Sequence, residues 1–222
     1  MTIKLAHSYT ALKMYENCPK RYYHQRITKE VVDQPGTATV YGERVHKQLE
    51  EYLKGNAPLP EETAALQPLC DTVKAGSEGG GMLLVEQEYT LTSDLQPTSW
   101  FAPDAWLRFK LDVLAIRGDN KAMVVDWKTG KRRPDFDQLE MFALAVFTFW
   151  PAVTSVTSMF VWTKENAIDK ETYKAKHKDE MWTRLLNRID RVEKSAETRN
   201  WPAKPSGLCK FCPCKGFCEF AS

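Results

Sequence analysis

The segment VVDWKTGK, residues 124–131, places an aspartate and a lysine directly after a run of β-branched residues. Val124 and Val125 favour a half-buried strand, in which side chains alternate between the two faces. Asp126 and Lys128 are two residues apart, so both side chains are expected on the same face of that strand. Taken alone, these eight residues are explained most simply by an ion pair at a strand end.

A second aspartate is expected opposite the first. Residues 105–116 and 121–129 are rich in strand-forming residues and are joined by the turn sequence RGDNK, which predicts a hairpin. If the turn is centred on Asp119, Asp112 lies across from Asp126. Two facing carboxylates repel each other unless a cation neutralises them, and carboxylates suit Mg²⁺ and Mn²⁺. The pair therefore predicts a divalent metal site with a lysine beside it.

Two other segments supply further candidates for this site. GERVH places Gly42 and His46 on one face of an expected helix. A lone helical histidine is more often a surface or packing residue, but its position ahead of the two strands favours a ligand. Glu86 and Glu88 give one strand an acidic face, which is usually solvated. Glu88 remains an open candidate for the metal site.

The composition is that of an ordinary globular protein. The 222 residues are 43% hydrophobic and 27% charged, and the net charge of +2 neither demands nor excludes a nucleic acid partner. No apolar run reaches eighteen residues and the N-terminus lacks a signal-peptide core, so an intracellular, cytoplasmic protein is expected. In a reducing compartment, the cluster of cysteines near the C-terminus predicts a metal site rather than disulfides.

The elements that must position these residues follow from periodicity and turn signals. Helices are expected at residues 8–17 (capped by Ser8), 36–54, 58–73, 134–149 and 171–198. Strands are expected at residues 82–91, 105–116, 121–129 and 153–163. The segment KAGSEGGG, residues 74–81, is expected to be a flexible connector. This order of elements predicts a mixed sheet with helices on its faces.

The hairpin with Asp112, followed by DWKTGK, resembles the Asp…(Asp/Glu)-x-Lys core of the PD-(D/E)XK nuclease superfamily, and DWKTG resembles its RecB-like branch. The resemblance implies an α/β (α+β) fold with a restriction-endonuclease-like core. That core is a mixed sheet of about four to five strands flanked by helices. It also implies that residues 1–222 form a single nuclease domain.

The same resemblance implies roles for the site residues. The metal ligands would be His46, Asp112, Asp126 and the backbone carbonyl of Trp127. Lys128 would orient or help to deprotonate the attacking water and stabilise the transition state. Gln138 matches the Gln-x-x-x-Tyr helix of the branch and would support the site, although Phe142 stands where the branch has tyrosine.

The cysteines resemble those of the cluster-bearing members of this branch, such as AddB and the small CRISPR-adaptation nucleases. The ligands of a 4Fe-4S cluster implied by this likeness are Cys18, Cys209, Cys212 and Cys218, within a cluster region formed by residues 1–30 and 199–222. A zinc site made of Cys209, Cys212, Cys214 and Cys218 remains the alternative. Cys70 is expected to be a buried core residue.

The resemblance as a whole implies a Mg²⁺- or Mn²⁺-dependent deoxyribonuclease, an exonuclease that acts on single-stranded DNA or DNA ends. A role in CRISPR adaptation or in phage recombination, with a protein partner in either, stays open. The competing function is a non-catalytic DNA-binding or scaffold protein with a zinc or iron–sulfur site. Phosphate contacts are expected from Lys131, Arg132 and Arg133 if these are not simply solvated. Base stacking is expected from Tyr22, Tyr23, Trp100 and Trp127 if these are not core residues.

Overall fold

The computed structural model describes residues 5–33, 36–78 and 80–221. Its centre is a six-stranded sheet in the order β2-β1-β3-β4-β5-β6, in which β4 and β5 are parallel and the other neighbours are antiparallel. The strands are β1 (Met82–Leu91), β2 (Pro97–Thr98), β3 (Leu107–Ile116), β4 (Lys121–Lys128), β5 (Ser155–Trp162) and β6 (Ala167–Lys174).

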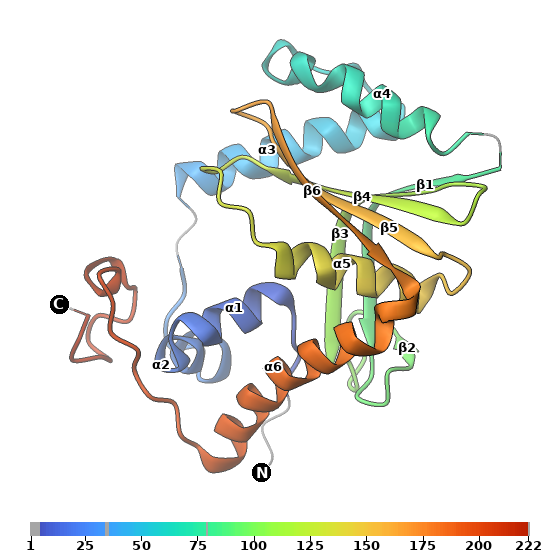
Figure 1. The fold of residues 1–222 in the computed structure, drawn as a ribbon. Helices are drawn as coiled ribbons and strands as arrows, with labels where there is room; N and C mark the ends of the chain where they lie inside the picture. Colours follow the sequence, from blue (N-terminus) through green and yellow to red (C-terminus); the bar gives the residue numbers. More distant parts are fainter. Residues whose placement is uncertain (1–4, 34–35, 79, 222) are drawn as a thin grey trace.

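Helices cover both faces of this sheet (Figure 1). The α-helices are α1 (Tyr9–Asn17), α2 (Pro19–Tyr22), α3 (Thr37–Leu53), α4 (Gln67–Ala75), α5 (Phe136–Phe149) and α6 (Lys178–Thr198). Shorter turns are the π-helical η1 (Tyr23–Ile27) and the 3₁₀ turns η2 (Glu61–Leu66), η3 (Ala175–His177) and η4 (Cys209–Phe211). None of the described helices is both long and apolar enough to cross a membrane.

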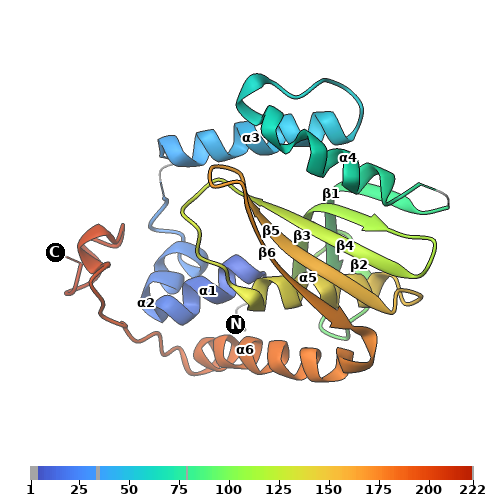
Figure 2. The same ribbon diagram turned by 45° about the horizontal axis from the view of Figure 1, so that its top comes forward.

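The three layers enclose two hydrophobic cores. Figures 1 and 2 show α3 and α4 on one face of the sheet and α1, α5 and α6 on the other. Val45 and Leu49 of α3 are fully buried against Val125 of β4, whereas α5 packs on the opposite face, where Phe147 and Phe160 are buried. The site described below therefore lies between elements that are fixed from both sides.

The predicted fold class is confirmed, and most predicted elements are present. Ser8 caps α1 by accepting a hydrogen bond from the Ala11 N–H at 3.3 Å. The helix predicted at residues 58–73 is divided into η2 and α4. The predicted connector includes residue 79, which lies outside the described residues; α4 already covers its beginning and β1 follows at Met82.

Two strands were not predicted, so the expectation of four to five strands was too low. β2 is only two residues long, and β6 occupies residues 167–174, where the first four residues of the helix predicted at 171–198 are strand instead. β6 pairs only with β5, so most of its side chains are in solvent and its polar sequence gives little strand signal. Helix α6 begins only at Lys178.

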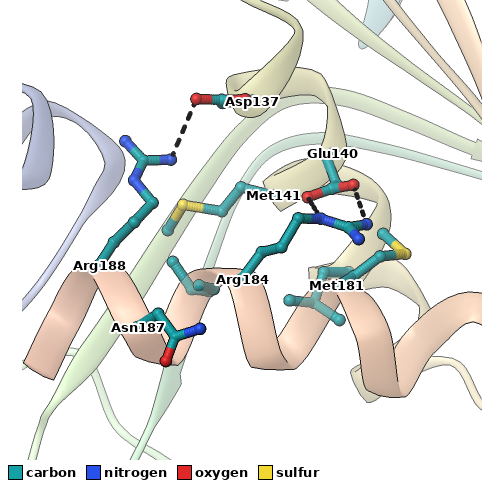
Figure 3. Close-up of a pocket in the computed structure, with 9 residues that line it drawn as sticks. Asp137, Glu140, Met141, Met181, Arg184, Asn187 and Arg188 are labelled. Carbon is teal, nitrogen blue, oxygen red and sulfur yellow. Dashed lines mark hydrogen bonds and ion pairs between the residues drawn. The ribbon is translucent and has the colours of Figure 1, made fainter.

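Helix α6 holds α5 in place (Figure 3). Arg184 of α6 forms an ion pair with Glu140 of α5, and Arg188 Nη1 lies 3.7 Å from the Asp137 carboxylate. A cavity of about 300 Å³ lies between the two helices beside these pairs. The contacts fix the helix that carries Gln138.

Candidate active site

The pairing of β3 and β4 ends at the two aspartates. The two strands pair as far as Val113 opposite Val125, in the predicted register that places Asp112 across from Asp126. At the next position the side chain of Asp112 replaces a backbone partner, since its Oδ2 accepts a hydrogen bond from the Trp127 N–H at 2.9 Å. Both carboxylates are buried at this point.

His46 on α3 reaches the same point from the neighbouring layer. Its Nε2 lies 2.8 Å from the carbonyl oxygen of Trp127, and its Nδ1 lies 3.4 Å from Asp112 Oδ2. Burial lowers the pKa of His46, but the Asp112 and Asp126 carboxylates outweigh this effect and leave the pKa raised. The structure thus brings together three of the predicted metal ligands: His46, Asp112 and the Trp127 carbonyl.

Gly42 allows α3 to approach the end of β4. A Cβ atom built on Gly42 would lie 3.0 Å from Thr129 Oγ1, which is closer than most Cβ contacts. The Gly-x-x-x-His spacing therefore has a direct physical reason here. One helical turn before His46, the helix needs a residue without a side chain to bring the imidazole to the strand ends.

Asp126 and Lys128 form the other half of the site. Lys128 Nζ lies 2.6 Å from Asp126 Oδ2, donates a hydrogen bond to Gln138 Oε1 at 3.2 Å and lies 5.0 Å from the centre of the Phe160 ring. Burial, and then the charge of Asp112, raise the pKa of Asp126 to about 7 although Lys128 opposes them. The Asp126 carboxylate is thus held in surroundings that need a further positive charge.

Glu86 is the acidic residue of β1 that reaches this site, rather than Glu88. One ligand atom each from His46, Glu86 and Asp112 lies within 4.8 Å of the others. The Glu86 backbone has a φ of +54° and interrupts the β1–β3 pairing opposite Asp112, and its carboxylate forms an ion pair with Lys110 at 3.0 Å. Glu88, which the sequence left as an open candidate, is exposed and is absent from this group.

The chemistry of these groups fits a divalent cation. Ligands 2.0–2.1 Å from an octahedral Mg²⁺ lie about 3 Å from one another, and His46 Nδ1 lies 3.4 Å from Asp112 Oδ2. The buried Asp126 Oδ2 contacts the Lys128 ammonium group at 2.6 Å, and a metal ion would supply the further positive charge that two buried carboxylates need. Carboxylate and carbonyl oxygens with one imidazole suit Mg²⁺ or Mn²⁺.

Five cysteines gather at a second place, between the two ends of the chain. A cavity of about 310 Å³ is lined by Cys18, Cys209, Cys212, Cys214 and Cys218. Cys18 Sγ accepts a hydrogen bond from the Lys204 N–H at 3.4 Å, and Cys209 Sγ accepts one from the Ser206 N–H at 3.2 Å. Burial, followed by the neighbouring Cys212, raises the pKa of the Cys214 thiol to about 12. Cys70 is fully buried in the core on the α3 side, as expected.

The other predicted DNA contacts have mixed outcomes. Tyr22 and Trp127 are buried in the two cores and do not offer ring faces to a ligand. Arg132 forms two hydrogen bonds with the Asp169 carboxylate, at 2.8 and 2.6 Å, so its charge is already neutralised. It anchors the loop after β4 to the start of β6.

A comparison with protein-family models identifies the family of this chain. Residues 6–219 match the PD-(D/E)XK nuclease superfamily. The chain belongs to this superfamily. Membership indicates a hydrolytic nuclease, and PD-(D/E)XK nucleases generally use Mg²⁺ or Mn²⁺. A comparison with curated proteins finds no match.

Two solved structures share the PD-(D/E)XK fold with the chain. A candidate exonuclease from Eubacterium rectale is 13% identical with a TM-score of 0.56, and the alignment covers 93% of this chain and 86% of that one. The protein SSO0001 is 15% identical with a TM-score of 0.50, and the alignment covers 98% of this chain and 87% of that one. At these identities the likeness supports the fold alone.

Proposed function

We propose that the protein is a Mg²⁺- or Mn²⁺-dependent deoxyribonuclease that hydrolyses phosphodiester bonds, and that it acts as an exonuclease on single-stranded DNA or on DNA ends. The observation that carries this proposal is the meeting of α3, β3, β4 and α5 at one point. His46 lies 3.4 Å from Asp112 there, and Lys128 lies 2.6 Å from Asp126. A scaffold protein would have no need to keep this set of groups intact.

The metal ligands in this proposal come from three elements. His46 of α3, Asp112 of β3, and Asp126 with the Trp127 carbonyl of β4 would hold the ion, and Glu86 of β1 lies next to them. A bound divalent ion lowers the pKa of a water molecule and neutralises charge on the scissile phosphate. Only one ring nitrogen of His46 can bind the ion: Nδ1 lies beside Asp112 Oδ2, while Nε2 lies 2.8 Å from the Trp127 carbonyl oxygen and would orient the ring.

Lys128 is the proposed catalytic residue. Its ammonium group is held between Asp126 and the Gln138 oxygen, so it has a fixed position at the edge of the metal site. From there it would orient the attacking water, assist the loss of its proton, and stabilise the negative charge of the transition state. Gln138 is a positioning residue that acts through Lys128.

For the cysteines we propose a 4Fe-4S cluster held by Cys18, Cys209, Cys212 and Cys218. The backbone N–H groups directed at Cys18 and Cys209 support thiolate ligands, since such hydrogen bonds are a means by which proteins tune these clusters. Among the described cysteines no three sulfur atoms lie within 4.8 Å of one another.

The test of nuclease activity is digestion of end-labelled single-stranded and duplex DNA with Mn²⁺, using protein purified without oxygen. We expect degradation of linear single strands and no cutting of circular single strands, because an exonuclease needs an end. Lys128→Ala and Asp126→Ala should abolish degradation, whereas Lys121→Ala, at the opposite end of β4, should retain most of it. Intact DNA after incubation with the wild type would contradict the proposal, and cutting of the circles would contradict exonuclease action.

A further inference from the structure

Exposed apolar side chains are concentrated around the cysteine cavity. Leu208 and Phe211 are 73% and 74% exposed, and Phe217 and Phe220 are each 44% exposed. Four large hydrophobic side chains in one short segment exceed what scattered surface residues explain. Figures 1 and 2 show this segment beside α2, on the side of the molecule toward which the N-terminal ends of α3 and α5 point.

A row of rings leads to this surface. The ring centres of Trp201 and Tyr23 are 5.7 Å apart, those of Tyr23 and His24 are 5.2 Å apart, and those of His24 and Phe217 are 5.0 Å apart. Trp201, Tyr23 and His24 are only partly exposed, whereas Phe217 ends the row in solvent. The three partly exposed rings therefore hold the exposed Phe217 ring in a fixed position.

Positive charges lie in the same two short segments of the chain as the rings, residues 23–29 and 201–217. Four exposed cations, none of which forms an ion pair with another described residue, are Arg26, Lys29, Lys210 and Lys215. Lys210 Nζ lies 5.0 Å from the centre of the Phe211 ring. The nearby acidic groups are already engaged, since Glu30 pairs with His24 and Glu219 pairs with Lys20. The surface is thus positive as well as aromatic.

The surface connects to the active site through the N-terminal helices. Lys13 of α1 forms an ion pair at 2.8 Å with Asp135, the residue before α5, and Gln138 follows within the first turn of that helix. Tyr15 of α1 packs against Trp201, with ring centres 6.1 Å apart, so α1 contacts both the row of rings and the residue before α5.

We propose that this surface, made up of Arg26, Lys29, Lys210, Phe211, Lys215 and Phe217, binds single-stranded DNA outside the catalytic site. Phe211 and Phe217 stack on bases, and the four cations contact phosphates. This inference rests on the proposed nuclease function. Rings interleaved with unpaired cations suit a single strand, because every base offers a face for stacking and every nucleotide carries a negative charge.

The test is binding of a fluorescent single-stranded oligonucleotide, measured by anisotropy with Ca²⁺ in place of Mn²⁺ so that the DNA stays intact. Phe217→Ala and Phe211→Ala should each weaken binding between about 5-fold and 100-fold. Phe217→Trp should restore it, because stacking is retained. Phe101→Ala is the matched control, since Phe101 is 88% exposed near β2, away from this segment.

The cations give an independent readout. Lys210→Ala and Lys215→Ala keep both rings, and each should reduce the slope of log Kd against log salt by about 0.7. In the nuclease assay, the variants that bind DNA more weakly should have a higher KM, in the same order as their Kd values. Their kcat should change little. The visible absorbance and the thermal unfolding temperature of each variant should match those of the wild type, which shows that the variant is folded and carries the same cofactor.

Two results would overturn the inference while leaving the nuclease proposal intact. One is wild-type affinity and salt slope in all four surface variants of an enzyme that still degrades DNA. The other is a concentration-dependent dimer that Phe211→Ala disperses without any change in DNA binding, which would make the surface an interface between copies. A wild-type protein that neither binds nor cuts DNA would overturn both proposals together.

Discussion

Asp126 must carry a negative charge to bind a metal ion, yet its surroundings favour the protonated form. It is 6% exposed, and burial together with Asp112 raises its pKa to about 7. Lys128 alone is not enough to cancel these effects. At the scale of single residues, the site is therefore an arrangement of charges that is incomplete without a further cation.

The first prediction concerns the pH dependence of stability in the metal-free protein. The pKa of Asp126 is higher in the folded than in the unfolded protein, so its contribution to stability is full below about pH 4 and is lost as the pH rises through 7. Relative to Asp126→Asn, the wild type should lose free energy of unfolding between these pH values. Denaturant titrations with chelator at pH 4 and 8 measure this difference, and Mn²⁺ should restore the wild type at pH 8 only. A difference between the two proteins that is the same at both pH values would contradict the predicted titration.

The second prediction concerns Glu86. Because its carboxylate lies within the group formed by His46 and Asp112, Glu86→Gln should weaken Mn²⁺ binding by about 10-fold or more. Glu88→Gln, two residues along the same strand, is the control and should leave the affinity unchanged. Calorimetric titration with Mn²⁺ gives both values, and equal affinities in the two variants would exclude Glu86 from the metal site.

The residues that the sequence could predict are those whose geometry is local. Asp112 and Asp126 are joined by a short hairpin, so a turn centred on Asp119 is enough to set their register. Glu86 could not be chosen over Glu88 because no tight turn joins β1 to β3, and because the left-handed backbone of Glu86 breaks the alternation of side chains. The only sequence signal for Glu86 as a metal ligand was the acidic character of the strand that carries it.

At the scale of elements, the site depends on how closely α3 approaches the end of β4. The third prediction is that Gly42→Ala weakens Mn²⁺ binding, because its Cβ would crowd Thr129 Oγ1 at 3.0 Å and move His46. The free energy of unfolding should fall by about 0–2 kcal/mol, since a helix gains about 1 kcal/mol from the alanine and loses about 1–3 kcal/mol from crowding. Adding Thr129→Ala should recover the affinity, and Gly130→Ala, whose Cβ meets nothing within 4 Å, is the control. No recovery in the double variant would contradict the steric explanation.

The fourth prediction concerns the ion pairs of α6. Arg188, whose side chain is 12% exposed, binds both oxygens of Glu16 on α1 and also faces Asp137 on α5. Arg188→Met should therefore lower the free energy of unfolding by about 2 kcal/mol or more, because Glu16 loses both of its close hydrogen bonds and keeps only the more distant Lys13 and Arg191, each at 4.0 Å. Arg184 pairs only with Glu140 and is half exposed, so Arg184→Met should cost about 1 kcal/mol or less. Urea unfolding of the two variants measures both values, and equal losses would show that the link to α1 adds nothing.

Elements with a buried face were predicted well, and elements without one were not. The apolar helix α5 and the central strands β3 and β4 have patterns that only a core position explains. β6 lies at the edge of the sheet with few buried residues, so its sequence resembles that of the charged helix after it. Its role in holding Arg132 through Asp169 appears only in the folded protein.

At the scale of the whole molecule, the two ends of the chain are held together. The Lys20 N–H donates to the Pro202 carbonyl at 3.2 Å, and Lys20 Nζ pairs with Glu219. The cysteine cavity lies at this junction. A cluster shared by Cys18 and the C-terminal cysteines would close nearly the entire chain into a loop.

The fifth prediction follows from that closure. Cys18→Ser should abolish the visible absorbance of a 4Fe-4S cluster and lower the free energy of unfolding by about 4 kcal/mol, by analogy with a disulfide that closes a long loop. Cys214→Ser should retain the absorbance, because Cys214 is outside the proposed ligand set. Spectra recorded without oxygen distinguish the two variants. The reverse pattern would assign the cluster to the local cysteines with Cys214 in place of Cys18, and a wild type without visible absorbance would favour the zinc site.

The most direct test of the central claim is the position of a Mn²⁺ ion, determined by anomalous scattering from crystals grown with manganese. The account predicts a peak within about 2.3 Å of His46, the Trp127 carbonyl and the carboxylates of Asp112 and Asp126. An ion bound elsewhere, in a protein that degrades DNA with manganese, would contradict the proposed mechanism. So would a map with no peak between α3 and the ends of β3 and β4.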